Sequence, residues 1–324
     1  MNKKILLIHT GGTISMSEDK GTGAVKPGKT NPLAEKSKEL SYLAEIAVEE
    51  PFNLPSPHIT EKEMIQLKNL IEKKMKEGSF SGIVITHGTD TLEETAYFLS
   101  LTIRAEIPIV FTGAMRSFSE LGYDGLQNLI NSIKVAASED GKNKGVLIVF
   151  NDEIHSPEYA TKFHTSNVSA FKSPQNGPIG IVGKGGVIFH HEPVKKKTYT
   201  VQNISKKVLL IKAYAGMDST LLLAAAHSNC DGVVIEALGQ GNLPPETLPG
   251  IEALQKKNIP VVLVSRCLAG HVLDTYGYTG GGKQLKEMGI IFANGLNGQK
   301  ARLKLMVALS VTNDLKKVEE IIQN

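Results

Sequence analysis

The sequence predicts an α/β protein in which a doubly wound N-terminal domain with a mostly parallel sheet precedes a smaller α/β domain. The first observation is that short runs of β-branched residues alternate with amphipathic segments, which is the rhythm of βαβ units. The second is the length of 324 residues, because a single hydrophobic core stops growing at about 250–300 residues. Two domains are therefore expected.

The strands expected in the first domain are short and almost wholly apolar, as strands buried on both faces of a parallel sheet are. They lie at residues 5–9, 82–86, 107–112 and 146–150. Helical segments are expected between them, at residues 61–76, 91–103 and 126–137. In the first helical segment Met64, Leu67 and Ile71 follow one another at helical spacing, so they share one face of a helix.

A polar stretch then divides the chain. Residues 188–206 are expected to be a linker between an N-terminal domain of residues 1–187 and a C-terminal domain of residues 207–324. The second domain repeats the same rhythm on a smaller scale. Its expected strands lie at residues 208–213, 232–236 and 261–265, and its expected helices at residues 219–228 and 249–257.

Composition and charge indicate which class of molecule the protein binds. The chain is 41% hydrophobic and 21% charged, with a formal net charge of +3 and lysines spread along its length. This pattern predicts a small-molecule partner rather than a nucleic acid or a membrane. No apolar run approaches the roughly 18 residues of a membrane helix. The apolar residues 5–8 are too few for a secretory signal, so a cytoplasmic location is expected.

Neither the cysteines nor the histidines predict a metal or redox site. Cys230 and Cys267 form no CxxC pair, and both are expected to be reduced, buried thiols. The histidines lack metal-ligand spacing, among them His87, His155 and His164. No metal and no cofactor is expected.

Two motifs rich in hydroxyl side chains follow two of the expected strands. Residues 10–14 (TGGTI) come directly after the first strand, and residues 86–91 (THGTDT) end the second strand and lead into a helix. In open α/β sheets, ligands bind at the carboxyl ends of the strands. Thr89 and Asp90 are expected beside the helix N-terminus, where a substrate carboxylate or a developing oxyanion is stabilised.

Each motif also has an interpretation without chemistry. Residues 10–14 could be an ordinary Gly-rich turn, although they do not spell the GxGxxG of a dinucleotide site. Thr91 and Glu94 have the spacing of a capping box, so the second motif could serve only to cap the helix. Elsewhere, residues 277–283 match the GxxxxGK of a P-loop, but Gln284 replaces the Ser or Thr that binds magnesium.

The two motifs resemble the signature motifs of the bacterial-type L-asparaginase family. Further similar segments follow in the family's order, at residues 92–99 (LEETAYFL), 113–116 (GAMR), 124–125 (DG), 150–152 (FND), 161–162 (TK) and 297–302 (NGQKAR). The resemblance therefore extends over nearly the whole chain. It implies a cofactor-independent amidohydrolase that converts L-asparagine to L-aspartate and ammonia.

The resemblance also implies which residues carry the chemistry. Thr13 and Thr89 would be the catalytic threonines, with Lys162 and Asp90 completing a triad around Thr89. A threonine hydroxyl is a poor nucleophile until a base removes its proton, and a desolvated lysine oriented by a carboxylate can be that base. A covalent acyl-enzyme and direct attack by water both remain open.

For substrate binding, the resemblance implies a role for each polar end of an amino acid. Asp90 would face the α-ammonium, Ser56 and the Thr89 backbone would hold the α-carboxylate, and the Ala114 carbonyl would receive the amide nitrogen. Asn242 resembles a residue that the family donates from a neighbouring subunit. The implied assembly is a homotetramer, built as a dimer of intimate dimers.

The sequence departs from the family pattern at three places. The family has a tyrosine in the loop after the first catalytic threonine, where Ala24 stands in this chain. It has a glutamate near the position of Thr279, where no carboxylate is present, and a glutamine beside Ser56, where Pro57 and His58 stand. The residue that activates Thr13 and the replacement for the glutamate are open.

Two other functions fit parts of this pattern. One is a glutaminase or an ammonia-supplying amidotransferase subunit, although such a subunit carries an extra N-terminal domain that is not expected here. Asparagine and glutamine differ by one methylene, worth only about 1–3 kcal/mol of discrimination, so the preference between them is open. The other is an amino-acid-binding sensor with little catalysis, which would bind asparagine without releasing ammonia.

Overall fold

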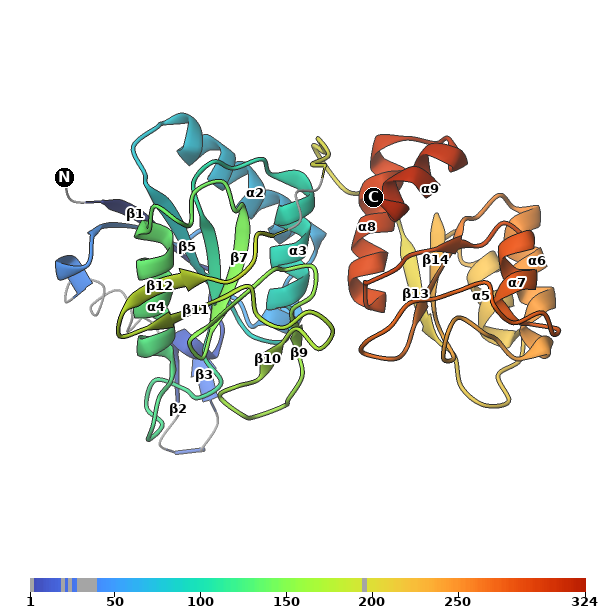
Figure 1. Cartoon of the computed structure of the whole chain (residues 1–324), viewed down its shortest axis with the longest axis horizontal. Coiled ribbons are helices and arrows are strands. Elements are labelled where there is room, and N and C mark those ends of the chain that lie inside the picture. Colours follow the sequence, from blue (N-terminus) through green and yellow to red (C-terminus); the bar gives the residue numbers. More distant parts are fainter. Residues whose placement is uncertain (1–2, 19–20, 23–24, 28–39, 194–196) are drawn as a thin grey trace. The chain divides into compact units, whose positions relative to one another are not determined.

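The structure is a computed structural model of the chain, and it describes residues 3–18, 21–22, 25–27, 40–193 and 197–324 (Figure 1). The chain divides into two compact units, residues 1–198 and 199–324. The division falls inside the polar stretch at residues 188–206. Within the described ranges, no helix is long and apolar enough to cross a membrane.

Among the described residues of the first unit, the main sheet has eight strands in the order β12-β11-β8-β7-β6-β5-β1-β4. Five neighbouring strands are parallel: β1 (Lys4–His9), β4 (Glu45–Glu49), β5 (Gly82–Thr86), β6 (Ile109–Thr112) and β7 (Val146–Phe150). The remaining strands extend the sheet in antiparallel pairing: β8 (Glu153–His155), β11 (Gly180–Gly183) and β12 (Gly186–Phe189).

Helices cover both faces of this sheet (Figure 1). On one face α4 (Gly125–Ala137) places Leu129 and Ile133 in a cluster with alternate strand residues such as Leu7 and Val84. The other face packs against α3 (Leu92–Thr102), which contacts β6 and β7 and has α2 (Glu61–Lys76) beside it. The predicted fold class, a doubly wound and mostly parallel sheet, is confirmed for this unit.

The strand order has a switch point between β1 and β5. From β1 the chain runs to β4 on one side, whereas from β5 it runs to β6 on the other side. The loops at the carboxyl ends of these two neighbouring strands therefore leave in opposite directions, which is the place where open α/β sheets bind ligands.

Several short elements join or flank the strands of this sheet. The β1 loop continues into the 3-10 turn η1 (Thr13–Ser15) and the antiparallel strands β2 (Met16–Glu18) and β3 (Val25–Pro27). Two further 3-10 turns are η2 (Leu40–Tyr42) and η3 (Ser56–His58). After β8, a separate hairpin pairs β9 (Thr161–Lys162) with β10 (Phe171–Lys172).

The second unit has a four-stranded parallel sheet, in the order β13 (Val208–Lys212), β14 (Gly232–Ala237), β15 (Val261–Ser265) and β16 (Ile291–Phe292). One face packs against α5 (Thr220–His227), α6 (Leu248–Lys256) and α7 (Gly282–Glu287), with η4 (Pro245–Thr247) before α6. The other face packs against α8 (Gly298–Val311), and α9 (Leu315–Gln323) contacts α8 and β16. This is the smaller α/β domain that the sequence predicts.

The two cysteines differ in exposure. Cys230 is buried, as expected, and its thiol lies 3.3 Å from the Ala225 carbonyl oxygen. Cys267 is exposed, so the expectation of two buried thiols is wrong for this residue. The reason is its position in the loop that follows β15, outside the packed strand.

Candidate active site

The loops after β1 and β5 touch through glycine. Gly12 has φ +88°, and a Cβ added there would lie 2.3 Å from the Cα of Gly88. Only glycine tolerates both this backbone conformation and this approach. Thr13 and Thr89 each directly follow one of these glycines, so the two predicted catalytic threonines lie on loops in backbone contact.

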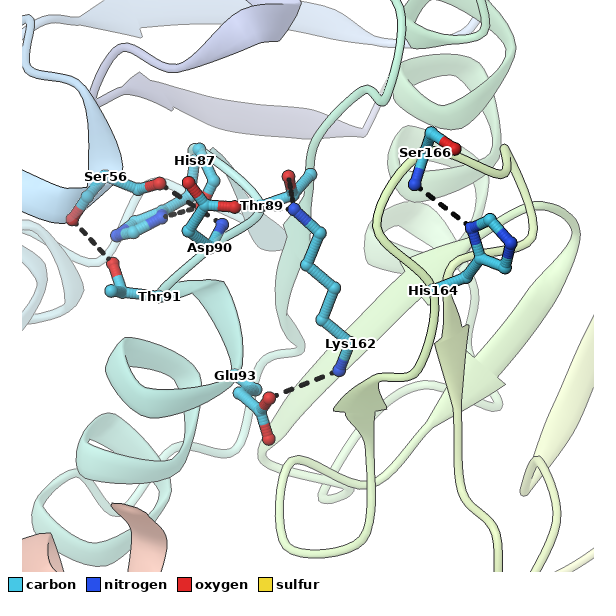
Figure 2. A network of polar contacts seen from close by, with 10 residues as sticks. Ser56, His87, Thr89, Asp90, Thr91, Glu93, Lys162, His164 and Ser166 are labelled. Atoms are coloured by element: carbon cyan, nitrogen blue, oxygen red, sulfur yellow. Dashed lines mark hydrogen bonds and ion pairs between the residues drawn. The ribbon is translucent and has the colours of Figure 1, made fainter. Parts of the chain in front are cut away.

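Thr89, Lys162 and Asp90 form a continuous polar chain (Figure 2). The Lys162 amine lies 2.9 Å from the Thr89 Oγ1 and 2.5 Å from the Asp90 Oδ1. The Lys162 side chain is only 18% exposed, whereas that of Asp90 is 57% exposed. The lysine is thus largely withdrawn from water and contacts the hydroxyl and the carboxylate together.

The β9–β10 hairpin holds Lys162 in place through its backbone (Figure 2). The buried carboxylate of Glu93, on α3, accepts a hydrogen bond from the Lys162 amide (3.2 Å). It also accepts one from the Thr161 hydroxyl (2.9 Å). On the paired strand, Lys172 forms an ion pair with Glu153 of β8 (2.9 Å). The hairpin is therefore tied both to α3 and to the main sheet, which restricts where the Lys162 amine can lie.

Ser56 approaches the Thr89 loop from η3. Its Oγ accepts a hydrogen bond from the Asp90 amide (3.2 Å), which leaves its own proton available for an anionic group. Its carbonyl accepts a hydrogen bond from the Thr91 hydroxyl (2.8 Å). A Cβ at Gly88 would lie 2.7 Å from the Ser56 side chain, so this contact also requires glycine.

The predicted capping box of Thr91 and Glu94 is wrong. Thr91 is the N-cap residue of α3 but makes no side-chain capping hydrogen bond. Its hydroxyl donates to the Ser56 carbonyl instead, so it joins two loops of the site. A capping box does occur in this unit at α2, between Thr60 and Glu63.

His87 is a neutral residue that supports the loop carrying Thr89. Its ring is fully buried, and this burial lowers the pKa of His87 to about 4. Nδ1 lies 2.8 Å from the Gly88 carbonyl, which can only accept, so Nδ1 carries the proton. Nε2 then accepts from the Thr95 hydroxyl at 3.0 Å. His87 fixes the Gly88 peptide and cannot be charged near neutral pH.

Gly113, the residue before Ala114, lies against the same loop. A Cβ at Gly113 would lie 2.6 Å from the His87 carbonyl oxygen and 3.2 Å from the Thr89 methyl group. The Gly113 carbonyl accepts a hydrogen bond from the Asn128 side chain (3.0 Å). Ala114, the next residue in the chain, is buried.

Thr13 is half-buried in η1, and its turn is held by neighbours rather than by its own hydroxyl. The Ser15 hydroxyl donates to the Gly12 carbonyl (3.0 Å), and the Tyr123 hydroxyl donates to the Ile14 carbonyl (2.7 Å). Tyr123 and Glu93 are two residues of the site that the sequence did not predict. Glu93 lies in the family-like run at residues 92–99, whereas no pattern in the sequence marks Tyr123.

The remaining predicted residues belong to the second unit or lie outside the described residues. Asn242 belongs to the second unit, where its Oδ1 accepts a hydrogen bond from the Gly282 amide (3.2 Å). Ala24 lies outside the described residues. Near Thr279, the Gly280 amide donates to the Gln284 side chain (2.7 Å). Within the described part of the chain, no group of His, Cys, Asp and Glu side chains could hold a metal ion.

Comparisons with known proteins cover both units. Residues 4–195 match the family model "Asparaginase, N-terminal", and residues 207–322 match "Glutaminase/Asparaginase C-terminal domain". The chain is 43% identical over 314 residues to a probable L-asparaginase of Deinococcus radiodurans, across 95% of this chain and 93% of the relative. It is 32% identical over 327 residues to a glutaminase-asparaginase of Pseudomonas aeruginosa, across 98% and 89%.

Two further similar proteins differ in the location that their names give. A probable periplasmic L-asparaginase of Haemophilus influenzae is 34% identical over 331 residues, across 99% of this chain and 92% of the relative. The solved structure of a probable cytoplasmic L-asparaginase from Campylobacter jejuni has a TM-score of 0.87 and 34% identity, and the match covers 99% of each chain.

Proposed function

The chain belongs to the asparaginase family and is an amidohydrolase, and we propose that it hydrolyses L-asparagine to L-aspartate and ammonia at the site around Thr89. The observation that carries this proposal is the contact from the Thr89 hydroxyl through the Lys162 amine to the Asp90 carboxylate, with distances of 2.9 and 2.5 Å. Such a chain joins a nucleophile, a base and a carboxylate that stabilises the protonated base.

In the proposed reaction, the neutral amine of Lys162 takes the proton of the Thr89 hydroxyl, and the oxygen attacks the amide carbon of the substrate side chain. The Asp90 carboxylate stabilises the ammonium that forms on Lys162. The proton then passes to the leaving nitrogen, which departs as ammonia and leaves an ester on Thr89. Water, activated by the same amine, hydrolyses the ester and frees L-aspartate. Thr13 supplies the second catalytic hydroxyl.

The polar groups around Thr89 suit the remaining parts of the substrate. The Ser56 hydroxyl, whose oxygen already accepts from the Asp90 amide, donates to the α-carboxylate together with the Thr89 backbone. The exposed carboxylate of Asp90 attracts the α-ammonium. The Ala114 carbonyl receives the amide nitrogen. These roles extend the family resemblance to named positions of this chain.

We also propose a homotetramer, built as a dimer of intimate dimers, in which Asn242 completes the site of a neighbouring subunit. The second unit leaves apolar side chains exposed that self-association would bury. They include Leu221 (44%) and Leu223 (38%) of α5 and the neighbouring rings of Tyr276 and Tyr278 (42% and 54%).

A cytoplasmic location is proposed for the protein. It is supported by the similarity to the Campylobacter jejuni protein, whereas the Haemophilus influenzae relative is named as periplasmic. Fractionation of cells that express the untagged chain tests the location, and recovery in the periplasmic fraction would contradict it.

The proposed reaction is tested by ammonia release from L-asparagine and, separately, from L-glutamine. Thr89→Val keeps the shape of the side chain and removes the hydroxyl, so we expect turnover to fall by at least about a thousandfold. Thr200→Val, which changes an exposed threonine, is the matched control and should retain the parental rate.

The alternatives give different results in the same assay. Faster ammonia release from L-glutamine would favour a glutaminase, a function motivated by the Pseudomonas aeruginosa relative. Saturable binding of L-asparagine in calorimetry without ammonia release would favour a sensor. Full activity of Thr89→Val would show that another residue is the nucleophile.

A further inference from the structure

The loop between β6 and α4 holds the segment that carries Thr13. Three hydrogen bonds join them: the Tyr123 hydroxyl donates to the Ile14 carbonyl (2.7 Å), the Phe118 amide to the Met16 carbonyl (2.9 Å), and the Glu18 amide to the Ser119 Oγ (2.9 Å). In Figure 1, β2 and β3 lie at the end of the unit to which the α4 N-terminus points. The two segments are remote in sequence, so only the fold brings them together.

Contacts other than the hydrogen bond to Ile14 also hold the Tyr123 ring in place. Its ring packs edge-on against Phe118, with ring centroids 5.3 Å apart. A Cβ at Gly125 would lie 2.2 Å from the Tyr123 hydroxyl, so the glycine at the start of α4 leaves the room that the ring occupies. Between them, the Asp124 carboxylate accepts hydrogen bonds from the Met115 amide (3.1 Å) and the Arg116 amide (3.0 Å).

The chemistry of Tyr123 is that of a donor rather than a base. Burial, together with the negative charge of Asp124, raises the pKa of Tyr123 above its ordinary value. The phenol therefore keeps its proton over the whole neutral range and donates it to the Ile14 carbonyl. It cannot take the proton of a threonine hydroxyl, so its action on Thr13 is through the backbone.

Ile14 transmits this contact to Thr13. Its side chain is fully buried in the cluster that also contains Ala114 and Leu129, so the residue is held from its side chain and from its carbonyl. Thr13 is the preceding residue and the first residue of the 3-10 turn. The half-buried Thr13 side chain is therefore attached to a turn in which the following residue, Ile14, is held by its buried side chain and by its carbonyl.

We propose that Tyr123 is a positioning residue for Thr13: by donating to the Ile14 carbonyl, it orients the turn that presents the Thr13 hydroxyl to the substrate. The inference rests on the proposed function, since it assigns Thr13 a part in turnover. The β6–α4 loop then serves the reaction twice, because it carries both Ala114 and Tyr123. Small losses of orientation at a reacting group lower turnover strongly.

Tyr123→Phe tests the proposal because it removes only the hydroxyl and keeps the ring against Phe118. We expect kcat for L-asparagine to fall about tenfold, while KM stays within about twofold, since the groups proposed to bind substrate are unchanged. Tyr42→Phe makes the same chemical change at a tyrosine that is 72% exposed, and it should retain the parental kcat and KM.

A double-mutant cycle distinguishes a positioning role from a general structural one. In a Thr13→Val background, where the hydroxyl to be oriented is missing, Tyr123→Phe should change the residual rate by less than about twofold. In a Lys162→Arg background, which keeps Thr13, the tenfold loss should persist. Thermal unfolding and calorimetric binding of L-aspartate should be nearly the same for the parent and for Tyr123→Phe.

Three results would overturn the inference while leaving the proposed function intact. They are a parental kcat for Tyr123→Phe, an equal loss of rate with and without Thr13, and a large fall in unfolding temperature accompanied by lost L-aspartate binding. Absence of ammonia release by the parent protein contradicts the proposed function itself, so the two failures can be told apart.

Discussion

At the scale of single residues, two buried histidines sit at the strand ends that carry the site. His9 ends β1, and its Nδ1 lies 2.8 Å from the Thr86 hydroxyl, while its Nε2 has no hydrogen-bond partner among the described residues. His87 follows β5 and uses both ring nitrogens. Burial lowers the pKa of His9 and of His87 to about 4 each, so both are neutral in the folded protein at neutral pH.

These histidines predict a loss of stability in mild acid. The ordinary pKa of histidine is 6.5, so between pH 6.5 and about 4 these two histidines are protonated in the unfolded chain but not in the folded protein. The free energy of unfolding therefore falls as the pH falls through this window, by up to about 1.4 kcal/mol per pH unit for each histidine. Above the window their contribution is fully present.

Urea unfolding between pH 4 and 7 measures this slope. His9→Gln should reduce this slope by up to about 1.4 kcal/mol per pH unit, because the unfolded chain then binds one proton fewer in this pH range. The exposed His190 offers a matched control, and His190→Gln should leave the slope unchanged. An identical slope in the parent and in His9→Gln would show that His9 titrates alike in the folded and unfolded chains.

At the scale of elements, the sequence predicts the helices and strands whose own residues show a clear hydrophobic pattern. The helix at residues 61–76 and the strands at residues 82–86, 146–150 and 261–265 have the expected bounds. Missed strands such as β8 and β11 are short, and β11 alternates between buried and exposed residues and contains two glycines. Their identity depends on antiparallel partners, not on their own apolar residues.

Helix α8 was missed for a different reason. It is buried on nearly all sides, including Lys300 and Lys304, which are 1% and 3% exposed. A helix without a polar face has no apolar stripe at helical spacing. The pattern by which the helix at residues 61–76 is recognised is therefore absent from α8.

Some residues of the candidate site also cannot be predicted from the local sequence pattern. Residues 10–14 and 86–91 stand out because they follow strands, but Lys162 was reached only through the family resemblance. Its place depends on Glu93, which lies 69 residues earlier in the chain, and Tyr123 meets Ile14 across 109 residues. Contacts between such distant segments are products of the fold and carry no local signal.

The β9–β10 hairpin makes a prediction of its own. Thr161→Val removes the hydroxyl that donates to Glu93 and leaves the shape of the side chain. We expect the free energy of unfolding to fall by about 1–3 kcal/mol, because a buried carboxylate loses a donor. We also expect kcat to fall several-fold, since the strand that carries Lys162 loosens.

Urea unfolding and ammonia release measure the two effects. Thr161→Ser restores the hydroxyl and should recover most of both, which separates the hydrogen bond from other consequences of the change. Parental stability and kcat in Thr161→Val would show that the Thr161–Glu93 hydrogen bond does not hold the hairpin.

At the scale of the whole molecule, the first unit contains every proposed catalytic and binding residue except Asn242, which belongs to the second unit. Under the proposed homotetramer, the Asn242 of one subunit serves the Thr89 of another. This arrangement can be tested without a structure of the assembly, because a mixed oligomer can contain one intact site although both of its chains are defective.

We therefore predict complementation between Thr89→Val and Asn242→Ala. Each variant alone should release little ammonia, and each should elute in size-exclusion chromatography as the parent does. In a mixed intimate dimer, the Asn242→Ala chain keeps Thr89 and receives the intact Asn242 of its neighbour, so one of the two sites of that dimer should regain the parental rate. Co-expression with two different tags, followed by purification on both, isolates the mixed oligomers. If Asn242 acted within its own chain, every site in these oligomers would lack one residue and the rate would stay at that of the separate variants.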